Sequence, residues 1–286
     1  MIFISSSCVK NDKISDSVKE LAELGYDNIE LSGGTTYYKG FEEDLQQLKE
    51  EYNLSYLLHN YFPPPQEHFV LNLASLDEGV FKASVEHCHR AIALSKKLGC
   101  DKYAIHAGFF IDLKLKEIGK ELGKEDLFDQ EAATNRFNTA FKELQRLAGS
   151  EVTLYLENNV LSGPNHNTYQ PQNPLMLTNL AAYKSMREEL DFKILLDVAH
   201  LMVSCNVLDK PFEQELQALA KETDYIHISN NNAILDENKG LDRESDLTQM
   251  LKTLDLKNKT ITLEVYESQE KIMTSFQTIQ ELVDAS

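Results

Sequence analysis

The chain has 286 residues, of which 42% are hydrophobic, and its formal net charge is −18. No apolar run reaches the roughly 18 residues that a membrane-spanning helix needs, and the acidic composition argues against a nucleic-acid partner, which requires clustered Lys and Arg. The length suits a single α/β barrel, so we expect one domain over residues 1–286. The N-terminus lacks the pattern of a signal peptide, so the expected location is the cytoplasm.

The chain alternates between short apolar runs and amphipathic stretches. Eight strands are expected, at Ile2–Ser5, Asn28–Leu31, Leu54–Leu58, Lys102–Ile105, Thr153–Leu156, Lys193–Leu196, Tyr225–Ile226 and Thr260–Leu263. Eight helices are expected in alternation with them, at Ser15–Leu24, Phe41–Tyr52, Asp77–Leu98, Gln130–Leu147, Pro174–Glu189, Pro211–Lys221, Glu244–Leu254 and Gln269–Val283. Eight strand–helix pairs in this order predict a single parallel (β/α)8 barrel, the TIM barrel.

Three longer segments interrupt this alternation. Residues 60–73 contain three consecutive prolines, which favour rigid turns, and residues 109–129 form a polar insertion. Residues 158–173 are long enough to act as a lid that shields a reactive intermediate from water. A plain surface loop is an equally good interpretation of that last segment.

Six consecutive strands end in, or are closely followed by, residues that bind metals or transfer protons. These residues are His59, His106, Glu157, Asp197 with His200, His227 and Glu264. The carboxyl ends of barrel strands surround one crevice, so these side chains should gather there although they are far apart in sequence. Carboxylates and imidazoles without a thiolate suit Mn²⁺, Co²⁺, Zn²⁺ or Mg²⁺. The sequence therefore predicts a divalent metal site.

The segments around these strand ends form a set of motifs. They are residues 25–31 (GYDNIEL), 71–75 (LNLAS), 98–99 (LG), 106–108 (HAG), 156–158 (LEN), 197–200 (DVAH), 227–229 (HIS) and 263–264 (LE). The Asp-x-x-His after the sixth strand and the Glu after the eighth are the most diagnostic. With these motifs the chain resembles the xylose isomerase-like barrel superfamily, which includes sugar epimerases and isomerases, inosose dehydratases and the endonuclease IV group.

The resemblance to the epimerase branch implies specific roles for these residues. One divalent ion would be held by Glu157, Asp197, His227 and Glu264. The two glutamates would also act as catalytic acid and base on opposite faces of the sugar, through an enediolate intermediate. His200 would contact the substrate oxygens.

Three further residues are expected to bind the substrate. His59 and His106 have no role in a scheme with one metal, so we expect them to bind sugar hydroxyls. A second metal bridged by Glu157 is the alternative. Asn230 lies where many relatives carry an Asp and can hydrogen-bond hydroxyls, although a polar turn explains it equally well.

The expected function is therefore that of a metal-dependent isomerase or epimerase acting on a sugar or sugar derivative. A dehydratase or lyase acting on a cyclitol or keto-sugar shares the first proton abstraction and stays open. An endonuclease IV-like phosphodiesterase is disfavoured, because residues 236–238 (DEN) lack the second histidine of that group's Asp-x-His motif. A barrel that only binds a partner is disfavoured by the complete ligand set. We expect a small carbohydrate as partner and no nucleic acid or membrane. A homodimer is the default expectation for enzymes of this kind.

Overall fold

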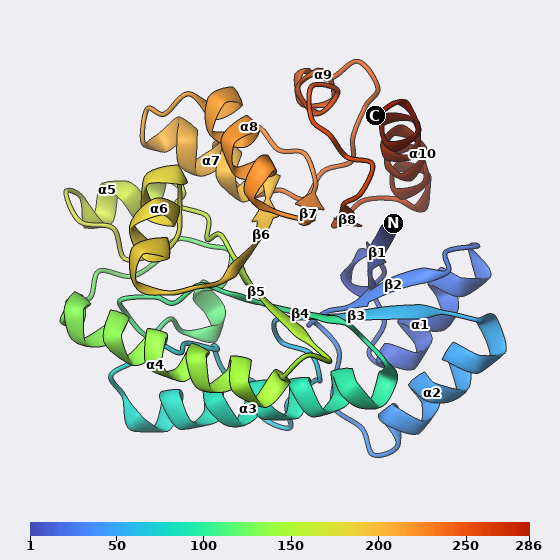
Figure 1. The fold of residues 1–286 in the computed structure, drawn as a ribbon, viewed down its shortest axis with the longest axis horizontal. Coiled ribbons are helices and arrows are strands. Elements are labelled where there is room, and N and C mark those ends of the chain that lie inside the picture. Colours follow the sequence, from blue (N-terminus) through green and yellow to red (C-terminus); the bar gives the residue numbers. More distant parts are fainter.

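The computed structural model describes residues 1–286 and shows eight parallel strands that close into one barrel (Figure 1). The strands are β1 (Ile2–Ser5), β2 (Asn28–Leu31), β3 (Ser55–His59), β4 (Lys102–His106), β5 (Thr153–Glu157), β6 (Lys193–Asp197), β7 (Tyr225–Ile228) and β8 (Thr260–Leu263). Each strand pairs with its neighbour in sequence, and β8 closes the barrel by pairing with β1. The predicted TIM barrel is confirmed.

Ten α-helices surround the strands, as Figure 1 shows. They are α1 (Ile14–Glu23), α2 (Phe41–Tyr52), α3 (Glu78–Leu98), α4 (Gln130–Ala148), α5 (Gly163–Tyr169), α6 (Leu180–Glu189), α7 (Val198–Val207), α8 (Phe212–Glu222), α9 (Asp246–Leu251) and α10 (Gln269–Ala285). Two 3-10 turns, η1 (Ser6–Cys8) and η2 (Leu115–Glu117), complete the elements. None of the helices is both long and apolar enough to cross a membrane.

The ends of α3 illustrate how the sequence sets these helix boundaries. The side chain of Asp77 accepts hydrogen bonds from the backbone N–H groups of Gly79 and Val80, which have no partner inside the helix. At the other end, Gly99 has a φ of 69°, a conformation that favours glycine and ends the helix. Both ends lie within one residue of the predicted boundaries.

Two of the three buried apolar clusters belong to the barrel itself. The larger one packs the outer faces of the strands against the helices, and it contains 64 buried residues. The smaller one fills the barrel interior and consists of Phe3, Leu57, Ala104, Tyr155, Leu195 and Tyr225. Such an interior layer makes the barrel a packed core rather than a pore. We call these six residues the barrel floor, because the polar residues discussed below follow them toward the carboxyl ends of the strands.

Several predicted helices differ from the structure. Helix α6 begins at Leu180 and not at Pro174, because Asn179 caps it by accepting the N–H of Ala182. Helix α9 is shorter at both ends than the predicted Glu244–Leu254. Helices α5 and α7 were not predicted. Most residues of α7 are buried, so it lacks the single apolar stripe that identifies a surface helix.

The polar insertion 109–129 is better packed than its composition suggests. Phe109, Ile111 and Leu122 share a buried cluster with Tyr169 of α5. Asn165 of α5 holds the insertion by accepting the N–H of Leu122 (2.8 Å) and donating to the carbonyl of Lys120 (3.3 Å). We call residues 109–129 together with α5 the roof. The segment predicted as a lid thus contains a helix that is hydrogen-bonded to its neighbour.

Candidate functional site

The period of two along a strand explains why the predicted residues meet. Five floor residues are each followed, two positions later, by a residue predicted from the sequence: Leu57 by His59, Ala104 by His106, Tyr155 by Glu157, Leu195 by Asp197 and Tyr225 by His227. Glu264 follows the buried Thr262 of β8 by the same step. Side chains two apart point to the same side of the sheet, so all six stand directly above the barrel floor.

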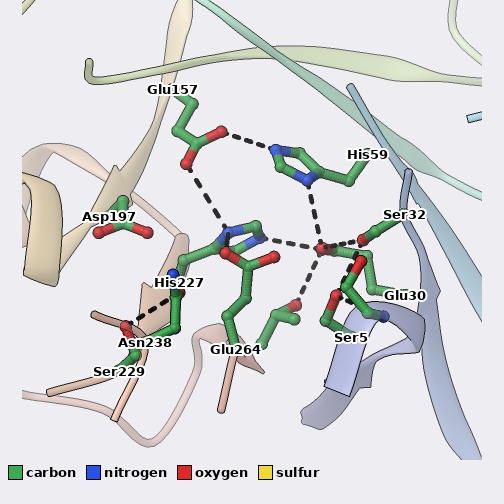
Figure 2. Close-up of polar contacts among 12 residues, drawn as sticks. Ser5, Glu30, Ser32, His59, Glu157, Asp197, His227, Ser229, Asn238 and Glu264 are labelled. Carbon is green, nitrogen blue, oxygen red and sulfur yellow. Dashed lines mark hydrogen bonds and ion pairs between the residues drawn. The ribbon is translucent and has the colours of Figure 1, made fainter. Parts of the chain in front are cut away.

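Glu157 lies close to four imidazoles of this cluster, and Figure 2 shows its contacts with His59 and His227. Its Oε2 is 2.6 Å from Nε2 of His59 and 3.3 Å from Nδ1 of His106. Its Oε1 is 3.5 Å from Nδ1 of His200 and 3.9 Å from Nδ1 of His227. Burial raises the pKa of the Glu157 carboxyl, but the imidazoles around it, His106 foremost, outweigh burial and hold that pKa well below its usual range. Glu157 is therefore ionised.

The four predicted metal ligands fall into two overlapping groups. Glu157, Asp197 and His227 have ligand atoms within 4.8 Å of one another. Glu264 belongs to a second group with His227, and its Oε2 is 3.5 Å from Nδ1 of that histidine. The structure thus brings all four to one place, with His227 as the shared member. A third group, His59 with His106 and Glu157, corresponds to the alternative of a second metal.

Asp197 and His200 are linked through the start of α7. Oδ1 of Asp197 accepts the backbone N–H of His200 at 2.7 Å. Burial raises the pKa of Asp197 to about 7, since the charge of His200, which lowers it, is opposed by Glu157 and Asp236. The ring of His200 makes a 2.9 Å hydrogen bond from Nδ1 to the carbonyl of Asn158, and its Nε2 is 3.2 Å from Oδ2 of Asp236. Burial lowers the pKa of His200, but the Asp197 and Asp236 charges raise it well above its usual value.

Glu30 of β2 is a site residue that the sequence analysis did not single out. It is fully buried, and Nε2 of His227 lies 3.0 Å from its Oε2. Burial raises the pKa of Glu30, but the charge and hydrogen bond of His227, helped by His59 and Tyr225, lower it to about 2. The available signal was its place in the strand: Glu30 lies between the outward-facing Ile29 and Leu31, so it must point into the barrel.

Asn230 is the predicted site residue that the structure does not bring to the cluster. Its backbone pairs with Lys239 in an isolated bridge, and its side-chain oxygen accepts the N–H of Asn231 at 2.9 Å. Asn230 is absent from the lining of the cavity, whereas Asn238 lines it. The polar-turn interpretation of Asn230 is therefore the one that the contacts favour, because its oxygen is used within the loop.

A cavity of about 1070 Å³ opens above the cluster. His59, His106, Glu157, His200 and Glu264 all contribute to its wall. The roof contributes apolar side chains to the same cavity, among them those of Phe109, Leu113 and Ile118. A polar, ionised end and a largely apolar wall are typical of small-molecule sites.

Three buried atoms of the cluster fit a bound cation. Oε1 of Glu157, Nδ1 of His227 and Nδ1 of His106 have no hydrogen-bond partner. Buried polar atoms are nearly always satisfied in folded proteins, so such atoms at one place need an explanation. Carboxylate oxygens and imidazole nitrogens are the donors that bind divalent ions of the Mn²⁺ to Zn²⁺ type. The residues present therefore fit a divalent metal.

Comparison with known proteins extends these observations. Residues 18–282 match the model of a family described as xylose isomerase-like TIM barrel. A D-tagatose 3-epimerase-like protein superposes with a TM-score of 0.71 at 18% identity, covering 99% of this chain and 97% of that chain. A D-allulose 3-epimerase from Methylomonas sp. in complex with D-allulose superposes with a TM-score of 0.65 at 14% identity, covering 98% of this chain and 96% of that chain. Endonuclease IV from Thermus thermophilus superposes with a TM-score of 0.61 at 14% identity, covering 100% of this chain and 99% of that chain.

No curated protein matches the sequence. At identities of 14% to 18%, the likeness to the solved structures shows a shared fold. Both sugar epimerases and an endonuclease occur among these structures, so the fold alone does not select a reaction. The chemistry has to be argued from the cluster.

Proposed function

The chain belongs to the xylose isomerase-like TIM barrel family, and on that premise we propose that it is a divalent-metal-dependent epimerase or isomerase of a sugar or sugar derivative. One observation carries the proposal: the ionised Glu157 and the carboxylate of Glu264 face the same unpartnered Nδ1 of His227. Two carboxylates beside one candidate metal ligand can act as general base and general acid next to an ion that stabilises the developing charge.

The ion would be held by Glu157, Asp197, His227 and Glu264. When bound, it supplies Lewis-acid stabilisation of the negative charge that develops on a sugar oxygen. The third group, with His59 and His106, leaves room in the proposal for a second ion at Glu157. Otherwise these two histidines, which line the cavity, serve as hydrogen-bonding partners of the sugar hydroxyls.

The proton transfers are assigned to the two glutamates. One carboxylate removes the proton beside the sugar carbonyl, and the other, in its protonated form, returns a proton from its own side. Return to the same carbon gives an epimer, and return to the adjacent carbon gives an isomer. The ring of His200 is held by Asn158 and Asp236 and lines the cavity, which supports assigning it to contact a substrate oxygen.

The roof and the acidic surface support a sugar over a nucleic acid as substrate. The roof encloses one side of the cavity with apolar side chains, which limits the access of water to a reactive enediolate. The net charge of −18 opposes the approach of a polyanionic duplex. The similarity to endonuclease IV is therefore interpreted as a shared barrel.

The test combines metal analysis with a product screen. The purified protein should contain a divalent metal and convert one of a panel of ketoses and keto-sugars into a product of equal mass. Glu157→Gln and Glu264→Gln should each lower kcat by about 10²–10⁴-fold, the usual contribution of a general acid or base, with an unchanged far-UV circular dichroism spectrum.

The matched control is Glu215→Gln, which removes a buried carboxylate of α8 that accepts the N–H of Leu180. This variant should keep its turnover. Full activity after exhaustive chelation, or in either site variant, would contradict the proposal. A product lighter by one water would assign the site to a dehydratase instead.

A further inference from the structure

We propose that Glu30 is a positioning residue of the metal site, which fixes the ring of His227 so that its Nδ1 is presented to the ion. This inference rests on the proposed function, since it presupposes an ion bound through His227. Glu30 itself touches neither the cavity nor a substrate: it is fully buried below the cluster and is absent from the cavity wall.

The two nitrogens of His227 have different surroundings. Nε2 lies 3.0 Å from Oε2 of Glu30, a carboxylate oxygen that also accepts hydrogen bonds from two hydroxyl groups, so this nitrogen is the donor of the hydrogen bond (Figure 2). Nδ1 faces Oε2 of Glu264 at 3.5 Å and Oε1 of Glu157 at 3.9 Å, and it has no hydrogen-bond partner. The hydrogen bond to Glu30 therefore selects the tautomer that leaves the lone pair of Nδ1 directed at the metal ligands.

Glu30 is itself held firmly by the strands around it. Besides His227, its Oε2 accepts hydrogen bonds from the hydroxyl of Tyr225 and, at 2.9 Å, from Oγ1 of Thr262. Its Oε1 accepts one from the hydroxyl of Ser32 at 3.4 Å. The donors come from β7, β8 and the end of β2, which are rigid elements. The carboxylate consequently has a defined position from which to orient the imidazole.

The same contacts argue that Glu30 is not a metal ligand. The distances alone would allow Glu30 to bind an ion, because a carboxylate oxygen of Glu30 lies within 4.8 Å of ligand atoms of Glu264, His59 and His227. However, three donors already use Oε2 of Glu30, the oxygen that faces His227, and the hydroxyl of Ser32 donates to Oε1. An ion bound there would have to displace buried hydrogen bonds. The Nδ1 of His227 and the Oε1 of Glu157, by contrast, are unpartnered.

A carboxylate behind a metal-binding imidazole has a known physical effect. It fixes the tautomer and the ring plane, and its charge makes the imidazole a stronger donor; its loss typically weakens metal binding by about 10–100-fold. Glu30 also faces Nδ1 of His59 at 3.8 Å, and the other nitrogen of that ring is 2.6 Å from Glu157. The contact with His59 is too long for a hydrogen bond, so His227 is the imidazole that Glu30 orients directly.

The experiment compares the affinity of full-length variants for Co²⁺, measured by competition with a chromophoric chelator. Glu30→Gln keeps the shape of the side chain and removes its charge. We expect its Kd for Co²⁺ to rise about 10–100-fold, with the same stoichiometry and the same visible absorption band as the wild type, because the ligands themselves are unchanged. Glu215→Gln, the distant buried carboxylate, should bind Co²⁺ as the wild type does.

The outcomes separate this inference from the proposed function. If the wild type binds no Co²⁺, the proposed function fails and the role of Glu30 fails with it. If the wild type binds and Glu30→Gln binds equally well, only the role of Glu30 is overturned. A lost equivalent of metal or an altered absorption band in Glu30→Gln would make Glu30 a ligand and also overturn the positioning role.

A measurement on the wild type keeps the inference testable if Glu30→Gln does not fold. The ¹⁵N spectrum of the histidine-labelled, Zn²⁺-loaded protein should show His227 protonated at Nε2 and metal-bound at Nδ1. The signal is assigned as the one missing from His227→Gln. A His227 ring with its proton on Nδ1 and the metal on Nε2 would overturn the inference.

Discussion

Protonation of His87 should destabilise the fold as the pH falls from 6.5 toward 4, and His87→Gln should remove this loss. His87 is fully buried on α3, and its Nε2 donates a 3.0 Å hydrogen bond to the carbonyl of Asn60, the residue after the site residue His59. Its Nδ1 has no partner. A second proton would therefore place a buried, uncompensated charge beneath the loop that follows β3.

The magnitude follows from the pKa of this group. Burial, opposed by the carbonyl of Asn60 and helped by Arg90, lowers the pKa of His87 from 6.5 to about 4. The unfolded chain therefore binds the proton more readily, so stability is complete above pH 6.5, declines below it and levels off below pH 4. Linkage gives a loss of roughly 2 kcal/mol at pH 5 and about 3 kcal/mol once both states are protonated.

The assay is urea unfolding at pH 7.5 and pH 5 in the presence of a chelator, followed by far-UV circular dichroism. Glutamine can still donate to Asn60 but does not titrate. When the pH is lowered from 7.5 to 5, the free energy of unfolding of the wild type should therefore fall by about 2 kcal/mol more than that of His87→Gln. The control is His89→Gln, which removes an exposed imidazole from the same helix. A difference between wild type and His87→Gln that does not depend on pH would refute the reasoning.

Two further predictions concern the packing around the site. Gly108→Ala should cost about 1–3 kcal/mol of stability in the same unfolding assay, because its Cβ would lie 2.7 Å from Cβ of Ala74 and 2.9 Å from Sδ of Met176; an unchanged midpoint would contradict the close packing. Asn165→Ala leaves the buried N–H of Leu122 without its acceptor, so amide exchange in the roof should accelerate while exchange in the barrel strands stays constant. Equal exchange in the roof would show that Asn165 does not hold it.

The barrel and its polar face could be predicted because the apolar runs that indicate strands end directly at residues of metal-binding type. Each apolar run is short, and the residue after it, such as Glu157 or Asp197, is of a type that is rarely buried without a partner. Periodicity then places these residues on one side of the sheet. No three-dimensional information is needed for this step, only the constant period of two.

Glu30 shows where such reasoning ends, because the period of two points its side chain into the barrel but does not reveal its partners. Its burial depends on donors from β7 and β8, Tyr225 and Thr262, which lie about two hundred positions away in sequence and are brought near only by barrel closure. For Asn230 the sequence left two interpretations open, and the contact that favours the polar turn is the hydrogen bond that its side-chain oxygen accepts within its own loop. Helix α7 was missed because its burial on nearly all sides leaves no stripe.

The barrel floor has a consequence for isotope exchange. Phe3, Tyr155 and Tyr225 close the interior below the cluster, so the cavity communicates with bulk solvent through its mouth. Under the proposed function, a hydrogen taken from a bound sugar would exchange with solvent through the mouth and not through the floor. In deuterated water, the amount of deuterium incorporated per product molecule would then compare two rates. One is the rate of exchange with solvent through the mouth, and the other is the rate at which the original hydrogen returns to the sugar.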